Sequence, residues 1–323
     1  MSSAPKPSAI RCKNLVKTYQ GKPPVEAVRG INFEVKVGEC YGVLGPNGAG
    51  KTTTIEILEG LLGATSGEAE VLGMHWGKDA IAIRERIGVS LQETQLSDRL
   101  SVGETLNLFR SFYSSGIAPA DAMARVSLEE KEKAWIKTLS GGQKQRLAVA
   151  TALVGDPELI FLDEPTTGLD PSSRRQLWDI IETFKRESKT VLLTTHYMEE
   201  AERLCDRVAI FDSGKIIAEG TPSELIRSIG AEHVIEFSVD RDHDTLDLSE
   251  IKSIPTVDQI EKTETDFRVT VGQPHVVLPE LITGLASKGI ALSSLTTRHA
   301  SLEDVFVSLT GRHLTDEEPA KSS

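Results

Sequence analysis

The 323-residue sequence predicts an α/β fold built on a parallel sheet, followed by a second, smaller α+β domain. Two observations predict the first part. A glycine-rich turn stands between an apolar strand and an amphipathic helix, and four apolar runs each end in polar side chains. The second part is predicted because, after about residue 222, short alternating segments interleave with segments of helical spacing.

Composition bounds the class of protein. Hydrophobic residues make up 39% and charged residues 26%, the balance of a soluble globular chain. No apolar run approaches the ~18 residues of a spanning helix, and the N-terminus shows no signal-peptide pattern. The net charge of −12 lies mostly in residues 223–323, which carry −9, and this argues against a nucleic-acid clamp. Cys12, Cys40 and Cys205 have no metal-site spacing and indicate a reduced, cytosolic setting.

The turn "GPNGAGKTT" fits the pattern G-x-x-x-x-G-K-[ST] between Gly45 and Thr52. Glycines let successive backbone N–H groups point at a β-phosphate, and the following helix start adds a favourable dipole. Lys51 then reaches the β/γ oxygens, and the Thr52 hydroxyl binds Mg²⁺. The predicted ATP-binding residues of this loop are Gly45, Pro46, Asn47, Gly48, Ala49, Gly50, Lys51, Thr52 and Thr53.

The other apolar runs end in side chains that suit the same ligand. After the run at 42–44, the runs are "IGVSLQ" at 87–92, "LIFLDE" at 159–164 and "VLLTTH" at 191–196. Ligands of open α/β sheets bind at the carboxyl ends of the strands, so these polar ends share one edge. Four such ends together predict a site.

The side-chain chemistry of the polar residue at each strand end indicates its role. Asp163 is expected to hold Mg²⁺ opposite Thr52 through water, and Glu164 to polarise the attacking water. His196 is expected to donate to the γ-phosphate. Gln92 is expected to touch Mg²⁺ or the water, although it also reads as an ordinary loop glutamine.

Two further residues each allow a functional and a structural interpretation. Tyr19 precedes the phosphate loop and offers a flat face for adenine, but it also reads as a half-buried strand tyrosine. Asp170 precedes a proline and a helix, which predicts an N-cap, and this structural role is compatible with a role across a subunit contact.

A second anion site is predicted at "LSGGQ", where Ser140, Gly141, Gly142 and Gln143 open a helix. Paired glycines are poor helix formers, so their presence at a helix start indicates that exposed N–H groups are needed there. Because the phosphate loop already binds one nucleotide, the helix start at Ser140 is free to bind the phosphate of a second nucleotide.

These motifs, in this order, resemble the nucleotide-binding subunit of an ABC transporter over about residues 8–222. The resemblance implies a P-loop NTPase cassette with a mixed sheet core, an antiparallel β lobe and a helical lobe at about 93–138. It implies ATP and Mg²⁺ as ligands and favours adenine stacking for Tyr19.

The resemblance also answers which nucleotide the second site serves. In this family two cassettes dimerise head to tail, so Ser140, Gly141, Gly142, Gln143 and Asp170 of one copy would face the ATP of the other. The implied partners are a second copy, or a paralogous cassette, and an integral-membrane permease that contacts the helical lobe; nucleic acid is not among them. The implied location is peripheral, on the cytoplasmic face of the cell membrane.

Residues 223–312 are predicted to form the α+β accessory domain. They read as strands at 233–240 and 266–271 and as helices at 245–254, 274–289 and 301–311, with the segment "IALSSLTT" at 290–297 before the last helix. The "SLEDVF" helix resembles the C-terminal extension of daunorubicin-resistance drug-export ATPases, and a dimerisation or regulatory role is expected. Residues 1–7 and 313–323 are expected to be disordered.

The prediction is therefore the ATP-hydrolysing subunit of an exporter. An importer subunit is the nearest alternative, disfavoured by "SLEDVF". A soluble, non-transport ABC ATPase is disfavoured because the 46 residues between Gln92 and Leu139 hold no long coiled coil, and only one signature is present. An ATP sensor without turnover is disfavoured by the complete set of Asp163, Glu164 and His196.

Overall fold

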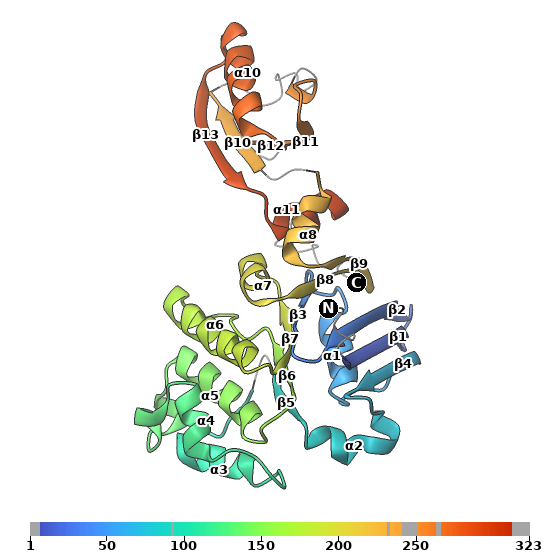
Figure 1. The fold of residues 1–323 in the computed structure, drawn as a ribbon, viewed down its shortest axis with the longest axis vertical. Helices are drawn as coiled ribbons and strands as arrows, with labels where there is room; N and C mark the ends of the chain where they lie inside the picture. Colours follow the sequence, from blue (N-terminus) through green and yellow to red (C-terminus); the bar gives the residue numbers. More distant parts are fainter. Residues whose placement is uncertain (1–6, 92–93, 231–232, 241–250, 263–265, 312–323) are drawn as a thin grey trace, which may run out of the picture. The chain divides into compact units, whose positions relative to one another are not determined.

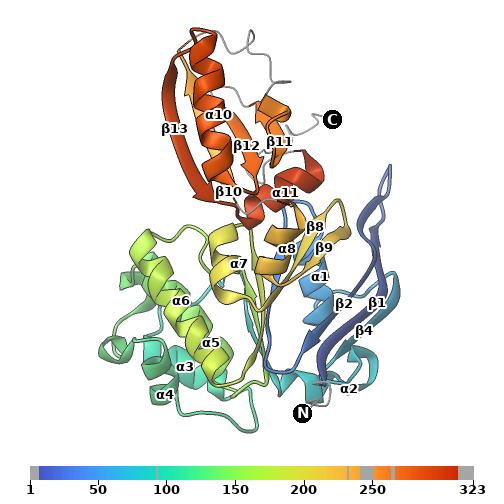
Figure 2. The same cartoon turned by 45° about the horizontal axis from the view of Figure 1, so that its top comes forward.

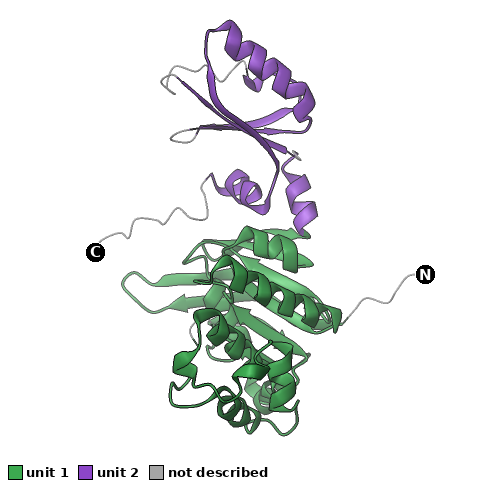
Figure 3. Ribbon diagram, turned by 90° about the vertical axis from the view of Figure 1, so that its left-hand side faces the viewer, with its two compact units in different colours: residues 1–221, 317–323 green, residues 222–316 purple. Residues whose placement is uncertain are grey.

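A computed structural model describes residues 7–91, 94–230, 233–240, 251–262 and 266–311. The chain divides into two compact units, and the division falls between Thr221 and Pro222. Figure 3 colours the two units green and purple. The segments expected to be disordered lie, apart from Pro7, outside the described residues, and so does Gln92.

The core of the first unit is a six-stranded mixed sheet in the order β5-β6-β7-β3-β8-β9. The first five strands are parallel, and β9 pairs antiparallel with β8. All residues of β3, β6 and β7 are buried, which is why these strands read as unbroken apolar runs. The strands are β3 Cys40–Leu44, β5 Ile87–Ser90, β6 Leu159–Asp163, β7 Thr190–Thr195, β8 Arg207–Asp212 and β9 Lys215–Gly220.

A second, three-stranded antiparallel sheet belongs to the same unit. It has the order β2-β1-β4, formed by Val25–Lys36, Ser8–Tyr19 and Ser66–Val71. Helix α1, Lys51–Leu58, packs with its apolar residues into a core shared by both sheets. Figure 1 shows α1 between the blue antiparallel strands and the central sheet. The phosphate loop therefore leads into a helix that is anchored in this shared core.

Helices from the middle of the chain form a separate cluster on the first unit. Helices α3, Val102–Arg110, and α4, Pro119–Arg125, pack on α5, Gly141–Leu153. Figures 1 and 2 both place α5 beside α6, Pro171–Arg186. Helices α2, Trp76–Arg84, and α7, Met198–Leu204, complete the unit.

The lobe expected at about 93–138 is not helical throughout, because α4 ends at Arg125. Ser127 has φ 54°, and only short 3-10 turns follow, at Glu129–Lys131 and Ile136–Thr138. The carbonyls of Val126 and Ser127 accept hydrogen bonds of 2.9 Å from Arg146 Nη1 on α5. A continuing helix would need these carbonyls for its own N–H groups, so tertiary contact overrides the local preference.

The second unit is a four-stranded antiparallel sheet with helices. The order is β11-β12-β10-β13, formed by Val257–Lys262, Phe267–Val271, His233–Val239 and Leu292–His299. Helix α10, Pro274–Ser287, covers one face and buries Val277, Leu281 and Leu285 there. Helices α8, Pro222–Ser228, and α11, Leu302–Thr310, pack on one another. Strand β11 was not predicted, and most of the helix predicted at 245–254 lies outside the described residues.

Helix α11 is the "SLEDVF" segment, and it has the predicted cap. Ser301 and Asp304 form a reciprocal capping box, and Gly311 ends the helix with φ 70°. Asp304 also accepts hydrogen bonds from both terminal nitrogens of Arg298 on β13, at 2.7 and 2.9 Å. Arg298 in turn donates to Glu236 on β10, so one buried carboxylate joins the helix cap to the sheet.

Candidate functional site

The phosphate loop leaves β3 at Leu44 and enters α1 at Lys51. Gly50 has φ 98°, and a Cβ on it would lie 2.3 Å from the carbonyl oxygen of Ala27, so only glycine fits there. Gly48 has φ 79° and no heavy atom within 4 Å of a built Cβ, so this side of the loop is open. The loop is thus closely packed against the protein on one side and accessible to a ligand on the other.

Lys51 is the buried cation of this loop, with only 4% of its surface exposed. Its Nζ donates to the carbonyls of Gly45 at 2.7 Å and Pro46 at 3.2 Å, and lies 3.7 Å from Glu164 Oε1. Burial lowers the pKa of Lys51, although Glu164 and Asp163 oppose this effect. The first turn of α1 holds no acidic residue and has no side-chain cap, so its N–H groups and Lys51 form a cationic cradle.

Asp163 and Glu164 lie at the end of β6 but differ in environment. Asp163 is 6% exposed, accepts a hydrogen bond from the Thr194 hydroxyl, and has its pKa raised by burial. Glu164 has the left-handed φ of 44°, which breaks the strand alternation between the two carboxylates. The strained backbone is held where the Glu164 N–H donates to Thr194 Oγ1 at 2.8 Å.

Glu164 lies between two basic side chains. Its Oε2 is 3.2 Å from His196 Nδ1 and accepts a hydrogen bond of 3.1 Å from Thr167 Oγ1. Hydrogen bonding to His196 lowers the pKa of Glu164, burial opposes this, and the charges of His196 and Lys51 lower it further. Glu164 is therefore an ionised carboxylate at neutral pH, beside the cradle.

Tyr19 ends β1 next to the same helix start. Its hydroxyl lies 3.3 Å from Thr53 Oγ1, and the residue is 39% exposed. Lys17 Nζ lies 5.3 Å from the ring centroid. The structure thus brings a partly exposed aromatic residue to the first turn of α1.

The signature residues begin α5. Ser140 is the exposed N-cap; its Oγ accepts from the Gln143 N–H at 3.3 Å, and Gln143 Oε1 accepts from the Ser140 N–H at 3.0 Å. A Cβ on Gly142 would lie 2.4 Å from Ser173 Oγ, so this glycine serves close packing against α6. Gly141 is exposed and has nothing near its built Cβ. The helix start faces solvent, as a site completed by another molecule would.

Asp170 has the predicted capping role at α6. Its Oδ1 accepts from the N–H groups of Ser172 at 2.9 Å and Ser173 at 3.1 Å, and Pro171 occupies the first helical position. These hydrogen bonds, led by that of the Ser173 hydroxyl, lower the pKa of Asp170. Within the described parts of the chain, no hydrogen bond or ion pair joins Asp170 or Ser140 to the phosphate loop.

The oxygens near the cradle suit a magnesium ion. Thr52 offers an exposed hydroxyl at the second residue of α1, and Asp163 offers a carboxylate at the end of β6. Oxygen ligands are those Mg²⁺ prefers, and the ion ordinarily keeps waters and phosphate oxygens in its shell. The described residues hold no group of three or more metal-ligating His, Cys, Asp or Glu side chains. A two-oxygen site fits an ion that arrives with the nucleotide.

The sequence analysis did not predict the buried acid Glu200, which follows His196 in the chain. Glu200 on α7 has no exposed surface, and its Oε1 accepts from Trp178 Nε1 at 2.9 Å. Burial raises the pKa of Glu200. The neighbouring Tyr197 ring lies 4.1 Å from that of His196 and 4.2 Å from the Arg174 guanidinium. An acid four residues after a strand-end histidine, facing a helix that carries a tryptophan, was the available signal.

The chain is similar to known proteins. The family model "ABC transporter" matches residues 28–167. The chain is 36% identical to the linearmycin resistance ATP-binding protein LnrL of Bacillus subtilis, over 95% of this chain and 100% of that protein. It is 40% identical to the Nod factor export ATP-binding protein I of Burkholderia orbicola, over 98% and 100%.

A solved structure shows the same cassette. The dimeric, post-hydrolysis structure of the ATP-binding cassette MJ0796, bound to ADP and Pi, has a TM-score of 0.60 and 27% identity. It covers 66% of this chain and 98% of the other. Within the described residues, no helix has the length and apolar character needed to cross a membrane. With the phosphate loop, the acid pair and relatives matched over their full length, the chain belongs to the ABC transporter family as one of its ATP-binding proteins.

Proposed function

We propose that this chain hydrolyses ATP as the energy-coupling subunit of an ABC exporter. One observation carries the proposal: the buried Lys51, the ionised Glu164 and His196 form a continuous chain of contacts at the open phosphate loop. The arrangement supplies a cation for the phosphates beside a carboxylate for water. The names of the relatives, which refer to linearmycin resistance and to Nod factor export, support the outward direction.

Catalysis follows from positioning and charge. Lys51 exchanges the carbonyls of Gly45 and Pro46 for phosphate oxygens, and the N–H groups of α1 join it. Glu164, held by His196, orients water for attack on the γ-phosphorus and accepts its proton. His196 then donates toward the γ-phosphate oxygens from the other side.

Separate residues would bind magnesium and adenine. Thr52 and Asp163 would hold Mg²⁺ with Gln92, which lies outside the described residues, and the ion would supply positive charge at the β/γ oxygens. Tyr19 would stack on adenine. The whole loop from Gly45 to Thr53 would cradle the phosphates.

The second anion site completes the assembly. Ser140 and Gly141 start α5 at the surface, with Gln143 half-buried and Gly142 buried behind them, and Asp170 starts α6. We propose that two copies, or one copy and a paralogue, meet so that these residues close on the partner's ATP. The neighbouring cassette structure is dimeric, which supports this arrangement. The dimer would act on a membrane permease from the cytoplasmic face of the cell membrane.

The test is steady-state phosphate release from MgATP by the full-length chain. We expect turnover in the wild type and its loss in Lys51→Ala, because the buried cradle then has no cation. Export is tested separately, by reconstituting the chain with its permease in vesicles and following ATP-dependent movement of linearmycin or of a Nod factor, the compounds that the relatives' names give. Turnover that is absent from the wild type would contradict the hydrolytic function.

A further inference from the structure

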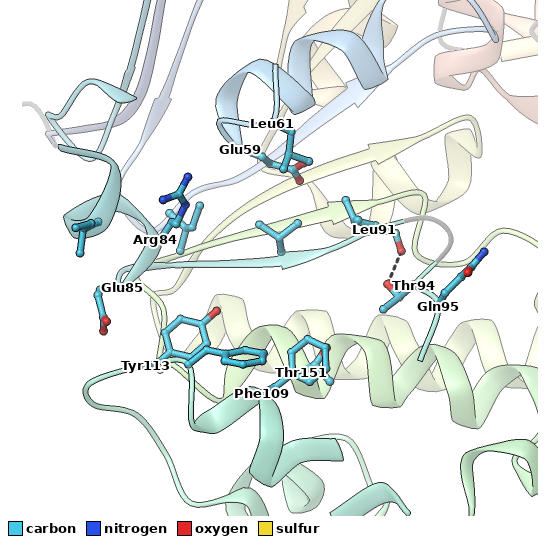
Figure 4. A pocket seen from close by; sticks show the side chains of 14 residues that line it. Glu59, Leu61, Arg84, Glu85, Leu91, Thr94, Gln95, Phe109, Tyr113 and Thr151 are labelled. Carbon is cyan, nitrogen blue, oxygen red and sulfur yellow. Dashed lines mark hydrogen bonds between the residues drawn. The ribbon is translucent and has the colours of Figure 1, made fainter. Parts of the chain in front are cut away.

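Two cavities on the first unit differ in chemistry. The larger has a volume of about 640 Å³ and a mostly apolar lining; Figure 4 shows its acids Glu59 and Glu85, which outnumber its one arginine, Arg84. The smaller has a volume of about 420 Å³, and six of its seven lining residues are polar or charged, two of them arginines. Both volumes are in the range of ligand-binding pockets, but the smaller cavity has the excess of cations that suits an anionic ligand.

The smaller cavity, the arginine cavity, is lined by residues of three helices. Arg125 is the last residue of α4, Arg146 lies on α5, and Gln176 lies on α6. Arg125 Nη1 donates to Oε2 of Glu187, the C-cap of α6, at 2.7 Å. This ion pair ties the end of α4 to the end of α6, so two walls of the cavity are joined by a fixed contact.

Arg146 has donors left over inside this fixed frame. Its Nη1 donates to the carbonyls of Val126 and Ser127, both at 2.9 Å, whereas its Nε and Nη2 make no hydrogen bond to a described residue. Together, Nε and Nη2 form the side-on fork of the guanidinium, which binds two oxygens of one anion. Burial lowers the pKa of Arg146, although the charge of Glu129 opposes this effect, and a bound anion would offset the cost of burial.

The other charges of the lining already have partners. Arg125 is paired with Glu187, and Asp179 Oδ1 lies 3.1 Å from Arg203 Nη2. Arg146 forms no ion pair with any residue that the structure describes. The cavity therefore holds one half-buried cation whose charge the surrounding side chains leave unmatched.

Neutral donors stand beside this cation. The Gln176 side chain is exposed, and so is Ser127, which follows α4 with φ 54°. Neither the Gln176 amide nor the Ser127 hydroxyl makes a hydrogen bond within the described part of the chain. Donors from α5, α6 and the end of α4 are thus available to one ligand.

We propose that the arginine cavity binds a small phosphorylated molecule, whose phosphate oxygens accept hydrogen bonds from the Arg146 fork, the Gln176 amide and the Ser127 hydroxyl. A phosphate suits these donors better than a carboxylate does, because its terminal oxygens point in three directions and the donors come from more than one wall. The cavity, at about 420 Å³, is larger than a phosphate group alone requires, so it has room for the organic part of the molecule.

The place of the cavity in the fold gives the ligand a consequence for hydrolysis, and this step rests on the proposed function. Arg146 lies six residues after Ser140, where α5 starts, and Gln176 lies six residues after Asp170, where α6 starts. An occupant that contacts both residues fixes the two helices relative to one another. Less freedom is then lost when both helix starts engage the partner's ATP, so occupancy raises the hydrolysis rate.

The binding experiment is isothermal titration calorimetry of the full-length chain with the phosphate monoester glycerophosphate as the probe. Lys51→Ala is the background, because it removes the cation of the phosphate loop and leaves the arginine cavity intact. Gln176→Glu is expected to weaken binding about tenfold and Gln176→Lys to tighten it about threefold, since the two place opposite charges at one exposed helix position. Gln273→Glu adds the same negative charge at an exposed residue of the second unit, and this matched control is expected to bind as the background does.

Arg146→Lys tests the fork itself. Lysine keeps the charge and a donor for the carbonyls of Val126 and Ser127 but has no planar fork, so binding is expected to fall about tenfold at a nearly unchanged melting temperature. Wild-type affinity in Arg146→Lys, or equal affinities in Gln176→Glu and Gln176→Lys, would overturn the inference. If Arg146→Lys does not fold, the two Gln176 variants decide the question alone.

Two further probes separate the possible sources of the anion. Malonate, a dicarboxylate, is expected to bind about tenfold more weakly than glycerophosphate, and equal binding would overturn the choice of a phosphate. Flotation with phosphatidylglycerol vesicles is expected to be the same with and without Arg146→Lys. Flotation that is lost in Arg146→Lys would assign the cavity to a lipid headgroup and overturn the proposal of a small soluble ligand.

The consequence for hydrolysis is measured on the chain with its phosphate loop intact. Glycerophosphate is expected to raise phosphate release from MgATP about twofold, and this rise is expected to be absent in Gln176→Glu. A rate that does not respond to the bound probe would overturn the coupling to hydrolysis. A wild type that releases no phosphate at all would contradict the proposed function instead, whereas binding in the Lys51→Ala background does not depend on turnover.

Discussion

Glu164 and His196 are in direct contact, with His196 Nδ1 3.2 Å from Glu164 Oε2. The two residues come from the ends of adjacent parallel strands, β6 and β7, and Lys51 lies on the other side of the carboxylate. The contact lowers the pKa of Glu164 and keeps it ionised. In the proposed mechanism, the base, its positioning partner and the phosphate-binding cation are thus in direct contact.

The first prediction concerns Glu164→Gln. The amide keeps the size and can accept from His196 or Thr167, but it cannot take a proton from water, so turnover is expected to fall by ~10²–10⁴. ATP binding is expected to persist, and the variant should accumulate as a dimer in MgATP. Phosphate release and size-exclusion chromatography measure the two effects. Glu130→Gln on the exposed surface is the control, and a monomeric Glu164→Gln with bound MgATP would contradict the sandwich dimer.

The second prediction tests whether Ser140 acts on another copy. Lys51→Ala and Ser140→Arg are each expected to be inactive alone. Mixed together, they form dimers in which one site combines an intact phosphate loop with an intact signature, and roughly a quarter of the wild-type rate is expected. A mixture that stays as inactive as its components would show that Ser140 serves its own phosphate loop.

The third prediction concerns Glu200. Glu200→Ala leaves Trp178 Nε1 buried without an acceptor and is expected to lower the free energy of unfolding by about 2 kcal/mol or more. Glu200→Gln keeps an acceptor oxygen and is expected to remain close to the wild type. Chemical denaturation of both variants measures the difference. Equal destabilisation by Gln and Ala would show that the charge, not the hydrogen bond, matters.

The fourth prediction is a pH dependence in the second unit. Burial raises the pKa of Asp304, but hydrogen bonds from Arg298 and Ser301 outweigh it, so the pKa is below its ordinary value. The stabilisation is therefore complete above the unfolded-state pKa of about 4 and is lost as the pH falls through the folded-state value.

The melting temperature, measured by thermal unfolding at a series of pH values from 7 to 3, checks this dependence. In Asp304→Asn the free energy of unfolding at pH 7 is expected to fall by about 3 kcal/mol, because Arg298 then lacks a buried carboxylate. On acidification, the stability of this variant is expected to fall less than that of the wild type. The exposed Glu280→Gln is the matched control. Parallel acid profiles for the wild type and Asp304→Asn would contradict the linkage.

Short-range sequence patterns predicted the elements that hold the candidate catalytic and binding residues. The four buried strands, the glycine loop and the caps at Asp170 and Ser301 have signals within a few residues, and the structure has them. The sequence did not predict the end of α4, since Arg146 takes the carbonyls of Val126 and Ser127 across the tertiary fold. Glu59 at the end of α1 is buried, and its carboxyl oxygens have no hydrogen-bond partner within the described part of the chain. It was not predicted either, because "ILEGLL" reads as an ordinary amphipathic helix end.

Helix α1 spans about 12 Å at 1.5 Å per residue, and Ile55, Ile57 and Leu58 are buried in the core shared by both sheets. Because a closely packed core resists local deformation, we expect α1 to move as a rigid body. A displacement of its Lys51 end would then be accompanied by a displacement of its Leu58 end.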